Sequence, residues 1–367
     1  MRRSRSPQDT GAPVTAPCPQ TFAVGNRRLG VGQPMFLVAE IGINHNGDMD
    51  LARRTIDAAS ASGADGVKFQ NFVTEDFVLD RRLTYDYISQ GRQVTESQYE
   101  MFKRCELRPG QLARLKEHCE SAGLVCFSTP SSEAGVVELA ELKVPLLKNG
   151  SDYLTHLPVV RAMAATGIPT VLSTGMATLA EIASAVEAFR QAGGRDLILL
   201  HCTSSYPTPP EDTNLRKIPT LAAAFGCPIG FSDHTEGITA ALGALALGAC
   251  ILEKHFTLDR NLPGPDHRFS ATPAEFVELA HAVRRLEEQL GQSAIGPTPS
   301  EELGRTAFRI SCAAARDMAA GERITAGDIL FLRPGRGIPP AQAYLLTGRK
   351  LARAKAGGEV FTAEDLD

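Results

Sequence analysis

Short continuous apolar runs recur along the first 290 residues of the chain, with helix-like stretches between them. Continuous runs of this kind are typical of parallel strands that helices cover on both faces of a sheet. Alternation through about 250 residues predicts a closed (βα)8 barrel, with an open doubly wound sheet as the alternative. The runs are FLVAEI (36–41), GVKFQ (66–70), LVCFST (124–129), VPLLK (144–148), PTVLST (169–174), LILLHC (197–202), PIGFS (228–232) and CILEKHF (250–256).

The pattern changes after residue 290. Residues 273–290 carry apolar side chains at helical spacing from Phe276 to Leu290, which predicts the last barrel helix with this face in the core. Residues 291–305 have the Gly, Pro and Ser content of a linker. Residues 306–367 consist of short segments broken by Gly and Pro, and predict a compact, turn-rich second domain.

Length and charge exclude some classes of protein. A chain of 367 residues suits one large α/β domain, here residues 21–290, plus a small one. A net charge of −4 provides no basic field for nucleic acid, and no segment approaches the ~18 uninterrupted apolar residues of a membrane span. Residues 1–20 lack the apolar stretch of a secretory signal and predict a disordered tail.

The eight cysteines include no C-x-x-C pair. Several lie in or beside the apolar runs, where thiols serve as small core residues. This usage predicts a reducing, cytoplasmic location.

Two histidines carry the strongest functional signal. His234 in GFSDHT and His255 in EKHFT each close an apolar run, and side chains at the C-terminal ends of barrel strands converge on one pocket. Two neutral imidazoles with open positions suit a divalent metal that polarises a carbonyl, with manganese, magnesium and cobalt as candidates. For either ring taken alone, a structural hydrogen bond at the strand end is the better interpretation. The neighbouring polar residues Ser232, Glu253 and Lys254 favour a functional site over a purely structural role for the two histidines.

Other predicted strand ends add a carboxylate, two lysines and several hydroxyl groups. A carboxylate ending an apolar strand is costly to desolvate, so Glu40 must be paired, liganding or catalytic. Lys68 and Lys148, together with hydroxyl donors, suit a phosphate or carboxylate and predict an anionic, phosphorylated small substrate. The accompanying strand-end residues are Gln70, Thr129, Ser151, Ser173, Thr203, Ser204 and Tyr206.

Loop residues are more ambiguous. Asp266 follows the eighth strand and is a candidate for binding sugar hydroxyls, although a solvated loop carboxylate has the same spacing. His45 and His267 are expected at the surface or as helix caps. Residues 80–102 are predicted to form a lid that selects the substrate.

Taken in order, AEIGINHNGD, GADGVKFQ, FSTP, STGMAT, LHCTSSYPTPPEDTNL, IGFSDHTEGI and EKHFTLDRNLPGPDH resemble the sialic acid synthase family across residues 35–365. The stretch AAGERITAGDILFLRPGRGI (319–338) resembles that family's antifreeze-like (SAF) module. The resemblance implies a TIM barrel followed by a small SAF domain of β-clip type. It also implies a domain-swapped homodimer in which the partner's module completes each active site.

The resemblance further implies a transferase that condenses phosphoenolpyruvate with an N-acylated hexose. The expected reaction converts open-chain N-acetylmannosamine to N-acetylneuraminate and phosphate by C–O cleavage. By matching position, His234 and His255 would bind the metal, Glu40 would be an acid/base, Asp266 would take sugar hydroxyls, and Arg333 would reach the acyl group in the other subunit. Phosphoenolpyruvate would contact Lys68, Gln70, Thr129, Lys148, Ser151, Ser173 and Ser232, with Thr203, Ser204 and Tyr206 nearby.

Three alternatives remain open from the sequence. An N,N'-diacetyllegionaminate synthase would use 2,4-diacetamido-2,4,6-trideoxymannose instead. A metal-dependent phosphosugar aldolase or isomerase would use the same barrel without phosphoenolpyruvate. A binding protein is suggested by the antifreeze-like module, but the many arginines of residues 306–367 do not suit a weakly charged ice-binding surface.

Overall fold

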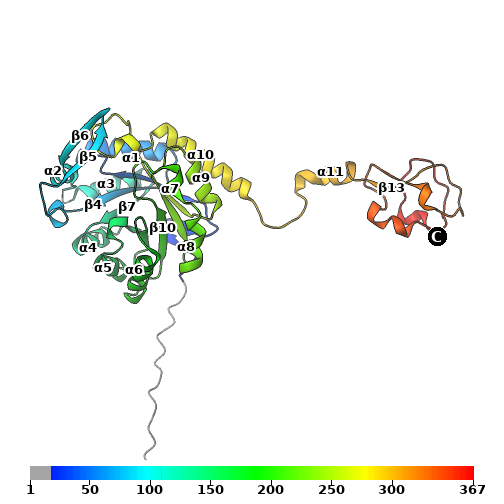
Figure 1. The fold of residues 1–367 in the computed structure, drawn as a ribbon, viewed down its shortest axis with the longest axis horizontal. Helices are drawn as coiled ribbons and strands as arrows, with labels where there is room; N and C mark the ends of the chain where they lie inside the picture. The colour runs from blue at the N-terminus through cyan, green and yellow to red at the C-terminus, as the bar shows by residue number, and fades with distance from the viewer. Residues whose placement is uncertain (1–17, 109) are drawn as a thin grey trace, which may run out of the picture. The chain divides into compact units, whose positions relative to one another are not determined.

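A computed structural model describes residues 18–108 and 110–367 (Figure 1). The predicted disordered tail lies outside the described residues up to residue 17. The chain divides between Gly291 and Gln292 into two compact units, which are described separately below. No helix in either described range combines the length and apolar character needed to cross a membrane.

The first unit is a closed barrel of eight parallel strands in the order β10-β11-β12-β3-β4-β7-β8-β9. Each predicted apolar run overlaps one strand, and the closure of the sheet confirms the barrel over the open sheet. The strands are β3 (Phe36–Gly42), β4 (Gly66–Asn71), β7 (Val125–Pro130), β8 (Leu147–Asn149), β9 (Thr170–Ser173), β10 (Leu197–Cys202), β11 (Ile229–Asp233) and β12 (Ile251–His255).

Helices cover the outside of this barrel (Figure 1). Capping boxes begin two of them: Thr178 caps α6, and Thr272 caps α10 ahead of Pro273. The predicted apolar face of α10 is buried from Phe276 to Val283, but Leu290 in its last turn is exposed, contrary to expectation. The helices are α1 (Met49–Ala61), α3 (Gln111–Ser121), α4 (Glu133–Glu141), α5 (Leu157–Ala165), α6 (Leu179–Gln191), α7 (Pro210–Thr213), α8 (Lys217–Phe225), α9 (Thr239–Ala246) and α10 (Pro273–Leu290).

A hairpin of β1 (Thr21–Val24) and β2 (Arg27–Gly30) precedes the barrel. Its Phe22 and Leu29 side chains join an apolar cluster with residues such as Phe36, which begins its barrel strand. The hairpin therefore closes the N-terminal end of the barrel, and the C-terminal ends of the strands are left to form a site.

The predicted lid segment contains an antiparallel hairpin, β5 (Thr84–Ser89) and β6 (Arg92–Ser97), which leads into α2 (Gln98–Cys105). Phe102 of α2 packs edge-to-face against Phe77, with ring centroids 4.9 Å apart. This aromatic contact ties the segment to the loop that follows β4.

Two loop histidines expected at the surface or as caps are buried. His45 Nδ1 accepts a hydrogen bond from the Gly47 amide at 3.0 Å, and His267 Nδ1 lies 2.7 Å from the Thr257 hydroxyl. The surface expectation is wrong because both rings hold the loops together from inside.

The second unit is small and rich in turns. It contains β13 (Ser311–Ala314) paired antiparallel with β14 (Ile329–Leu332), and its core includes Met318 and Phe361. The helix α11 (Glu302–Ala307) begins inside the predicted linker and ends beyond it. The remaining elements are the short 3-10 turns Thr74–Asp76, Ser151–Tyr153 and His267–Phe269 of the first unit, and Pro299–Glu301, Ala326–Asp328, Pro340–Leu345 and Ala363–Asp365 of the second.

Candidate active site

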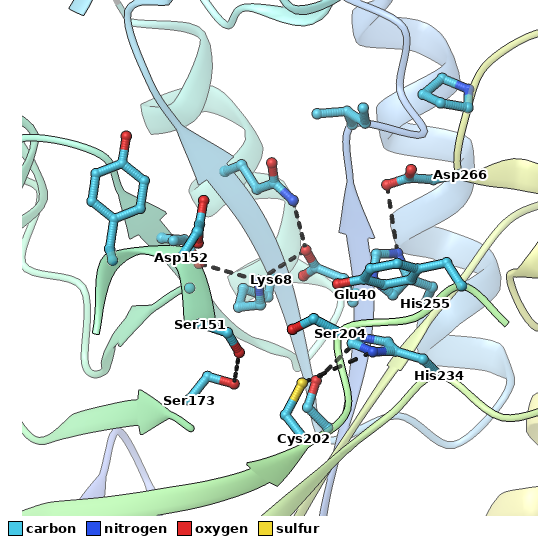
Figure 2. A pocket seen from close by; sticks show the side chains of 18 of the residues that line it. Glu40, Lys68, Ser151, Asp152, Ser173, Cys202, Ser204, His234, His255 and Asp266 are labelled. Carbon is cyan, nitrogen blue, oxygen red and sulfur yellow. Dashed lines mark hydrogen bonds and ion pairs between the residues drawn. The ribbon is translucent and has the colours of Figure 1, made fainter. Parts of the chain in front are cut away.

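A cavity of about 570 Å³ lies at the C-terminal ends of the barrel strands (Figure 2). Its lining includes every predicted site residue except Thr203 and Arg333. Parallel strands explain this convergence, because side chains at the same end of adjacent strands point into one space.

Two lysines and two carboxylates form a buried network at the base of the cavity. Lys68 Nζ lies 2.8 Å from Glu40 Oε1, and Lys148 Nζ lies 2.8 Å from Glu253 Oε1. Lys68 also approaches Glu253 at 3.8 Å and donates to Thr129 Oγ1 at 3.1 Å. The four charged side chains are at most 6% exposed, so each charge depends on the others for compensation.

The two carboxylates differ in their readiness to bind a proton. Burial raises the pKa of Glu40, and Lys68 opposes that effect only in part. Burial also acts on Glu253, but Lys148 and Lys68 outweigh it and hold the pKa of Glu253 at about 2. Glu40 Oε2 is buried without a hydrogen-bond partner. Glu253 is therefore the fixed anion, and Glu40 is the group suited to exchange a proton.

Hydroxyl groups line the cavity beside this network. Ser151 donates to Ser173 at 2.9 Å (Figure 2). It also accepts a hydrogen bond from the Gly175 amide at 3.0 Å. A Cβ at Gly175 would collide with the hydroxyls of Ser151 and Ser204. The glycine after β9 thus allows the backbone to approach the hydroxyl groups closely.

The two predicted histidines meet at the ends of β11 and β12, with ring centroids 5.4 Å apart. His234 Nδ1 donates to the Thr203 carbonyl at 2.8 Å, and Nε2 lies 3.4 Å from the Ser232 hydroxyl. His255 Nδ1 is buried without a hydrogen-bond partner, 3.7 Å from Asp266 Oδ2. Tyr206 packs against His234 at a centroid distance of 4.1 Å.

This pair fits a divalent metal ion. Burial and the neighbouring His234 keep the pKa of His255 well below its usual range, so its imidazole is neutral and able to coordinate. Within residues 18–108 and 110–367, no group of three or more His, Cys, Asp or Glu side chains is arranged to hold a metal. A divalent ion held here would have the two imidazoles as its protein donors, which would leave coordination positions for a substrate.

Asp266 lies in the cavity wall after β12, with an 18% exposed side chain. Burial raises its pKa to about 7, with a further contribution from Glu40. The freely solvated loop position that the sequence allowed is therefore not observed.

Comparison with known proteins agrees with this architecture. The NeuB family model matches residues 55–294, and the SAF domain model matches residues 311–367. The chain belongs to the NeuB family.

Relatives of this NeuB chain match nearly its whole length. The uncharacterized protein MJ1065 of Methanocaldococcus jannaschii is 41% identical, covering 95% of this chain and 99% of its own. The N,N'-diacetyllegionaminic acid synthase of Legionella pneumophila is 37% identical, covering 94% and 98%. The solved N-acetylneuraminic acid (sialic acid) synthetase of Leptospira borgpetersenii has a TM-score of 0.71 at 35% identity, covering 78% and 95%. The resemblance to sialic acid synthases with a SAF module is confirmed.

Two predicted residues of this NeuB chain lie outside the cavity lining. The Thr203 hydroxyl donates to the Asp212 carbonyl at 3.0 Å, and Thr203 acts on the site only through the carbonyl that orients His234. Arg333 is an exposed residue of the second unit, where its guanidinium lies 5.4 Å from the Phe308 ring centroid.

Other lining residues of the NeuB site were not assigned a role from the sequence. The place of Glu253 in the cavity could have been predicted from the sequence, because it lies two residues before His255 on one strand and so shares its face. Asp152, in the turn after β8, had no such signal. The wall formed by Phe72, Phe77, Met101 and Phe102 also lacked a signal, because those residues come from the loop after β4 and from α2.

Proposed function

We propose that this chain is a transferase that condenses phosphoenolpyruvate with the open-chain form of an N-acylated hexose and releases phosphate. One observation carries the proposal. A single cavity combines a two-lysine anion site, a pair of adjacent imidazoles and a carboxyl group with an unpaired oxygen, Glu40 Oε2. Joining an anionic enol phosphate to an aldehyde requires all three.

Lys68 and Lys148, with the hydroxyls of Ser151, Ser173 and Thr129, would bind the phosphate and carboxylate groups of phosphoenolpyruvate. Because Glu253 is ionised, protonation of Glu40 leaves this four-residue network with one net positive charge. The protonated state of Glu40 therefore favours binding of the anion. Gln70, which donates to Glu40 Oε1 at 3.3 Å, holds that carboxyl group in place.

His234 and His255 would hold the divalent cation, for which we propose manganese, with magnesium or cobalt as alternatives. A cation bound there supplies Lewis acidity that makes the sugar aldehyde carbon electrophilic. Asp266 would accept hydrogen bonds from sugar hydroxyls when it is ionised. Ser204, Ser232 and Tyr206 would complete the walls around both substrates.

The proton needed in the condensation would come from Glu40. Carbon C3 of phosphoenolpyruvate forms a bond to the aldehyde carbon, and the aldehyde oxygen takes a proton from Glu40 to become a hydroxyl group. Water adds to the cationic C2 and loses a proton, which restores the carboxyl group. Cleavage of the C2–O bond then releases phosphate and leaves the 2-keto acid.

For the sugar we propose N-acetylmannosamine, which gives N-acetylneuraminate. A second candidate, 2,4-diacetamido-2,4,6-trideoxymannose, is favoured by the apolar wall of Phe72, Phe77, Met101 and Phe102. Its C6 methyl group and second acetyl group suit such a wall. The name of the Legionella relative, N,N'-diacetyllegionaminic acid synthase, supports the same candidate.

We further propose a cytoplasmic, domain-swapped homodimer in which Arg333 of one subunit reaches the acyl group of the sugar in the other. All eight cysteines are free thiols, which supports a reducing compartment. The exposure of Arg333 on the SAF unit leaves its guanidinium accessible to a ligand.

The test is phosphate release from phosphoenolpyruvate by metal-stripped protein with added Mn²⁺. The assay is run with N-acetylmannosamine, its 6-phosphate and 2,4-diacetamido-2,4,6-trideoxymannose in parallel. Release that requires both the metal and one of these sugars supports the synthase and names its substrate. If none of them elicits release, the synthase proposal is wrong for these sugars, and phosphosugar aldolase or isomerase chemistry without phosphoenolpyruvate becomes the better reading.

A further inference from the structure

A buried ion pair lies directly behind the two histidines. Asp233 of β11 and Lys254 of β12 are register partners, and Lys254 Nζ lies 2.8 Å from Asp233 Oδ2. The two side chains are 0% and 7% exposed. Because side chains alternate along a strand, they point away from the cavity, which their neighbours Ser232 and Glu253 line.

The pair also ties down the backbone on both sides of His234. Lys254 Nζ donates a second hydrogen bond to the Thr235 carbonyl at 2.8 Å. Asp233 Oδ1 accepts from the Thr235 amide at 2.9 Å and from its hydroxyl at 2.7 Å. One ammonium group, on the residue just before His255, therefore holds the residues that flank His234.

The two rings depend on this support to different degrees. His234 is oriented by its own hydrogen bond to the Thr203 carbonyl. His255 Nδ1 has no hydrogen-bond partner, so the direction of this ring follows from its backbone and its packing. The backbone of His255 is held on one side by pairing with Glu40 of β3 and by the Ala271 amide, which donates to the His255 carbonyl at 2.7 Å. Toward His234, the side chain of the adjoining Lys254 supplies the polar link through Asp233 and Thr235.

Fold stability alone does not account for the pair. Taking two charges out of water is costly, and apolar side chains of similar volume often stabilise a core as well or better. We infer that Asp233 and Lys254 are positioning residues that set the spacing of the two imidazoles for a divalent cation. This inference rests on the proposed function, since it requires His234 and His255 to hold that cation.

The decisive variant removes both charges together. Asp233→Leu/Lys254→Met leaves no unpaired buried charge, but the Thr235 amide, hydroxyl and carbonyl lose their side-chain partners, so the variant is expected to fold with a lowered melting temperature. Its Kd for Mn²⁺, measured on full-length protein by the electron paramagnetic resonance signal of free Mn²⁺, is expected to rise roughly 10- to 100-fold, as on loss of other supports behind metal ligands. Asp233→Asn is the milder companion, because it keeps the shape of the side chain, and its Kd should rise in the same direction.

Asp65→Asn is the matched control. Asp65 is also a buried, ion-paired carboxylate, with Arg284 at 2.7 Å, but it lies just before β4 at the opposite end of the barrel. The Asp65→Asn substitution should lower the melting temperature and leave the Mn²⁺ Kd unchanged.

Wild-type Kd values in both the double variant and Asp233→Asn would overturn the positioning role. A double variant that fails to fold leaves the decision to Asp233→Asn. Absence of Mn²⁺ binding by the wild-type protein itself would instead overturn the cation site, and the inference with it. If the wild type binds Mn²⁺, His255→Ala does not, and the ion-pair variants bind it as the wild type does, then the inference fails while the proposed cation site stands.

Discussion

Glu40 and Glu253 illustrate how one buried network gives two carboxylates different chemistry. Both are buried near Lys68, but Glu253 has Lys148 as a second partner and accepts from the Ser232 hydroxyl at 3.1 Å. Glu40 has an oxygen with no partner. The opposite pKa shifts of the two carboxyl groups thus follow the number of donors around each one.

Glu253→Gln tests the anchoring role. Loss of the carboxylate leaves two buried ammonium groups facing one remaining anion, so the free energy of unfolding should fall by about 3–5 kcal/mol. Urea denaturation followed by circular dichroism measures it. Glu120→Gln, which removes a surface partner of Lys116, should cost ~0–1 kcal/mol. Equal effects of the two substitutions would argue against a compensated network.

His255→Ala tests the metal assignment. Mn²⁺-dependent phosphate release should be abolished while the far-ultraviolet circular dichroism spectrum is retained, because the ring ends a strand whose backbone pairing does not need it. His118→Ala is the control, since His118 pairs with Asp57 outside the cavity. Activity like that of the wild type in His255→Ala would remove this histidine from the metal site.

At the scale of elements, the barrel was predictable and its insertion was not. Strands buried on both faces, such as residues 197–202, appear as unbroken apolar runs that periodicity detects. The β5–β6 hairpin is largely exposed, so its alternation carries little hydrophobic signal and only a lid was predicted for 80–102. The 3-10 turn Pro299–Glu301, which runs directly into α11, did have a sequence signature, the Thr298 to Glu301 capping box within the segment predicted as linker.

The type of element on which a site residue lies explains whether its position could be predicted from the sequence. Strand-end residues such as Lys68 and His234 could be located because strand order fixes their position. The apolar wall was missed because Phe72, Phe77 and Phe102 meet only through packing between a loop and α2, with centroid distances of 4.9 to 5.6 Å. Contacts between side chains of different elements leave no regular spacing in the sequence from which they could be predicted.

Phe102→Ala tests that wall as part of the sugar site. Removing the ring should raise the KM for the sugar roughly tenfold, the scale of loss from a hydrophobic subsite, and change the KM for phosphoenolpyruvate by less than about twofold. Steady-state phosphate release with each substrate varied in turn gives both values. Leu79→Ala, at a fully exposed position in the loop that follows β4, should change neither. A selective rise in the KM for phosphoenolpyruvate would place the wall against the other substrate.

At the scale of the whole molecule, the two units have different sources of stability. The barrel has a large apolar core, whereas the small core of the second unit is supplemented by Asp365, which is fully buried with Lys355 at 2.7 Å and Arg353 at 2.5 Å. A small domain buries proportionally less apolar surface, so individual polar contacts weigh more in it.

The second unit should therefore be sensitive to acid. Burial raises the pKa of Asp365, but hydrogen bonds from Lys355, the Thr362 amide and Arg353 outweigh it and hold the pKa at about 2, below the ordinary 3.8. A depressed pKa contributes stability above pH 3.8 that is lost as the pH falls toward 2. Hydrogen exchange of residues 351–366 in the full chain, corrected for intrinsic rates, should show protection falling over this range. Asp365→Asn should be less protected at pH 6 and should lack this dependence; an unchanged acid profile would contradict the assignment.

If SAF modules are exchanged between subunits, two defective variants should restore activity when they are combined in one dimer. A site built from a single chain would not show this recovery. Glu40→Ala subunits would lack the proposed proton donor, and Arg333→Ala subunits should bind the sugar weakly. In a mixed dimer with exchanged modules, the barrel that carries Glu40 receives Arg333 from its partner. One of the two sites is then intact, so kcat/KM for the sugar should recover to about half of the wild-type value. Dimers isolated through two different affinity tags, assayed below the KM of the sugar, give the measurement, with each homodimer as control. If each site used its own Arg333, both sites of the mixed dimer would be defective and no recovery would occur, because Glu40 and Arg333 would never be intact in the same site.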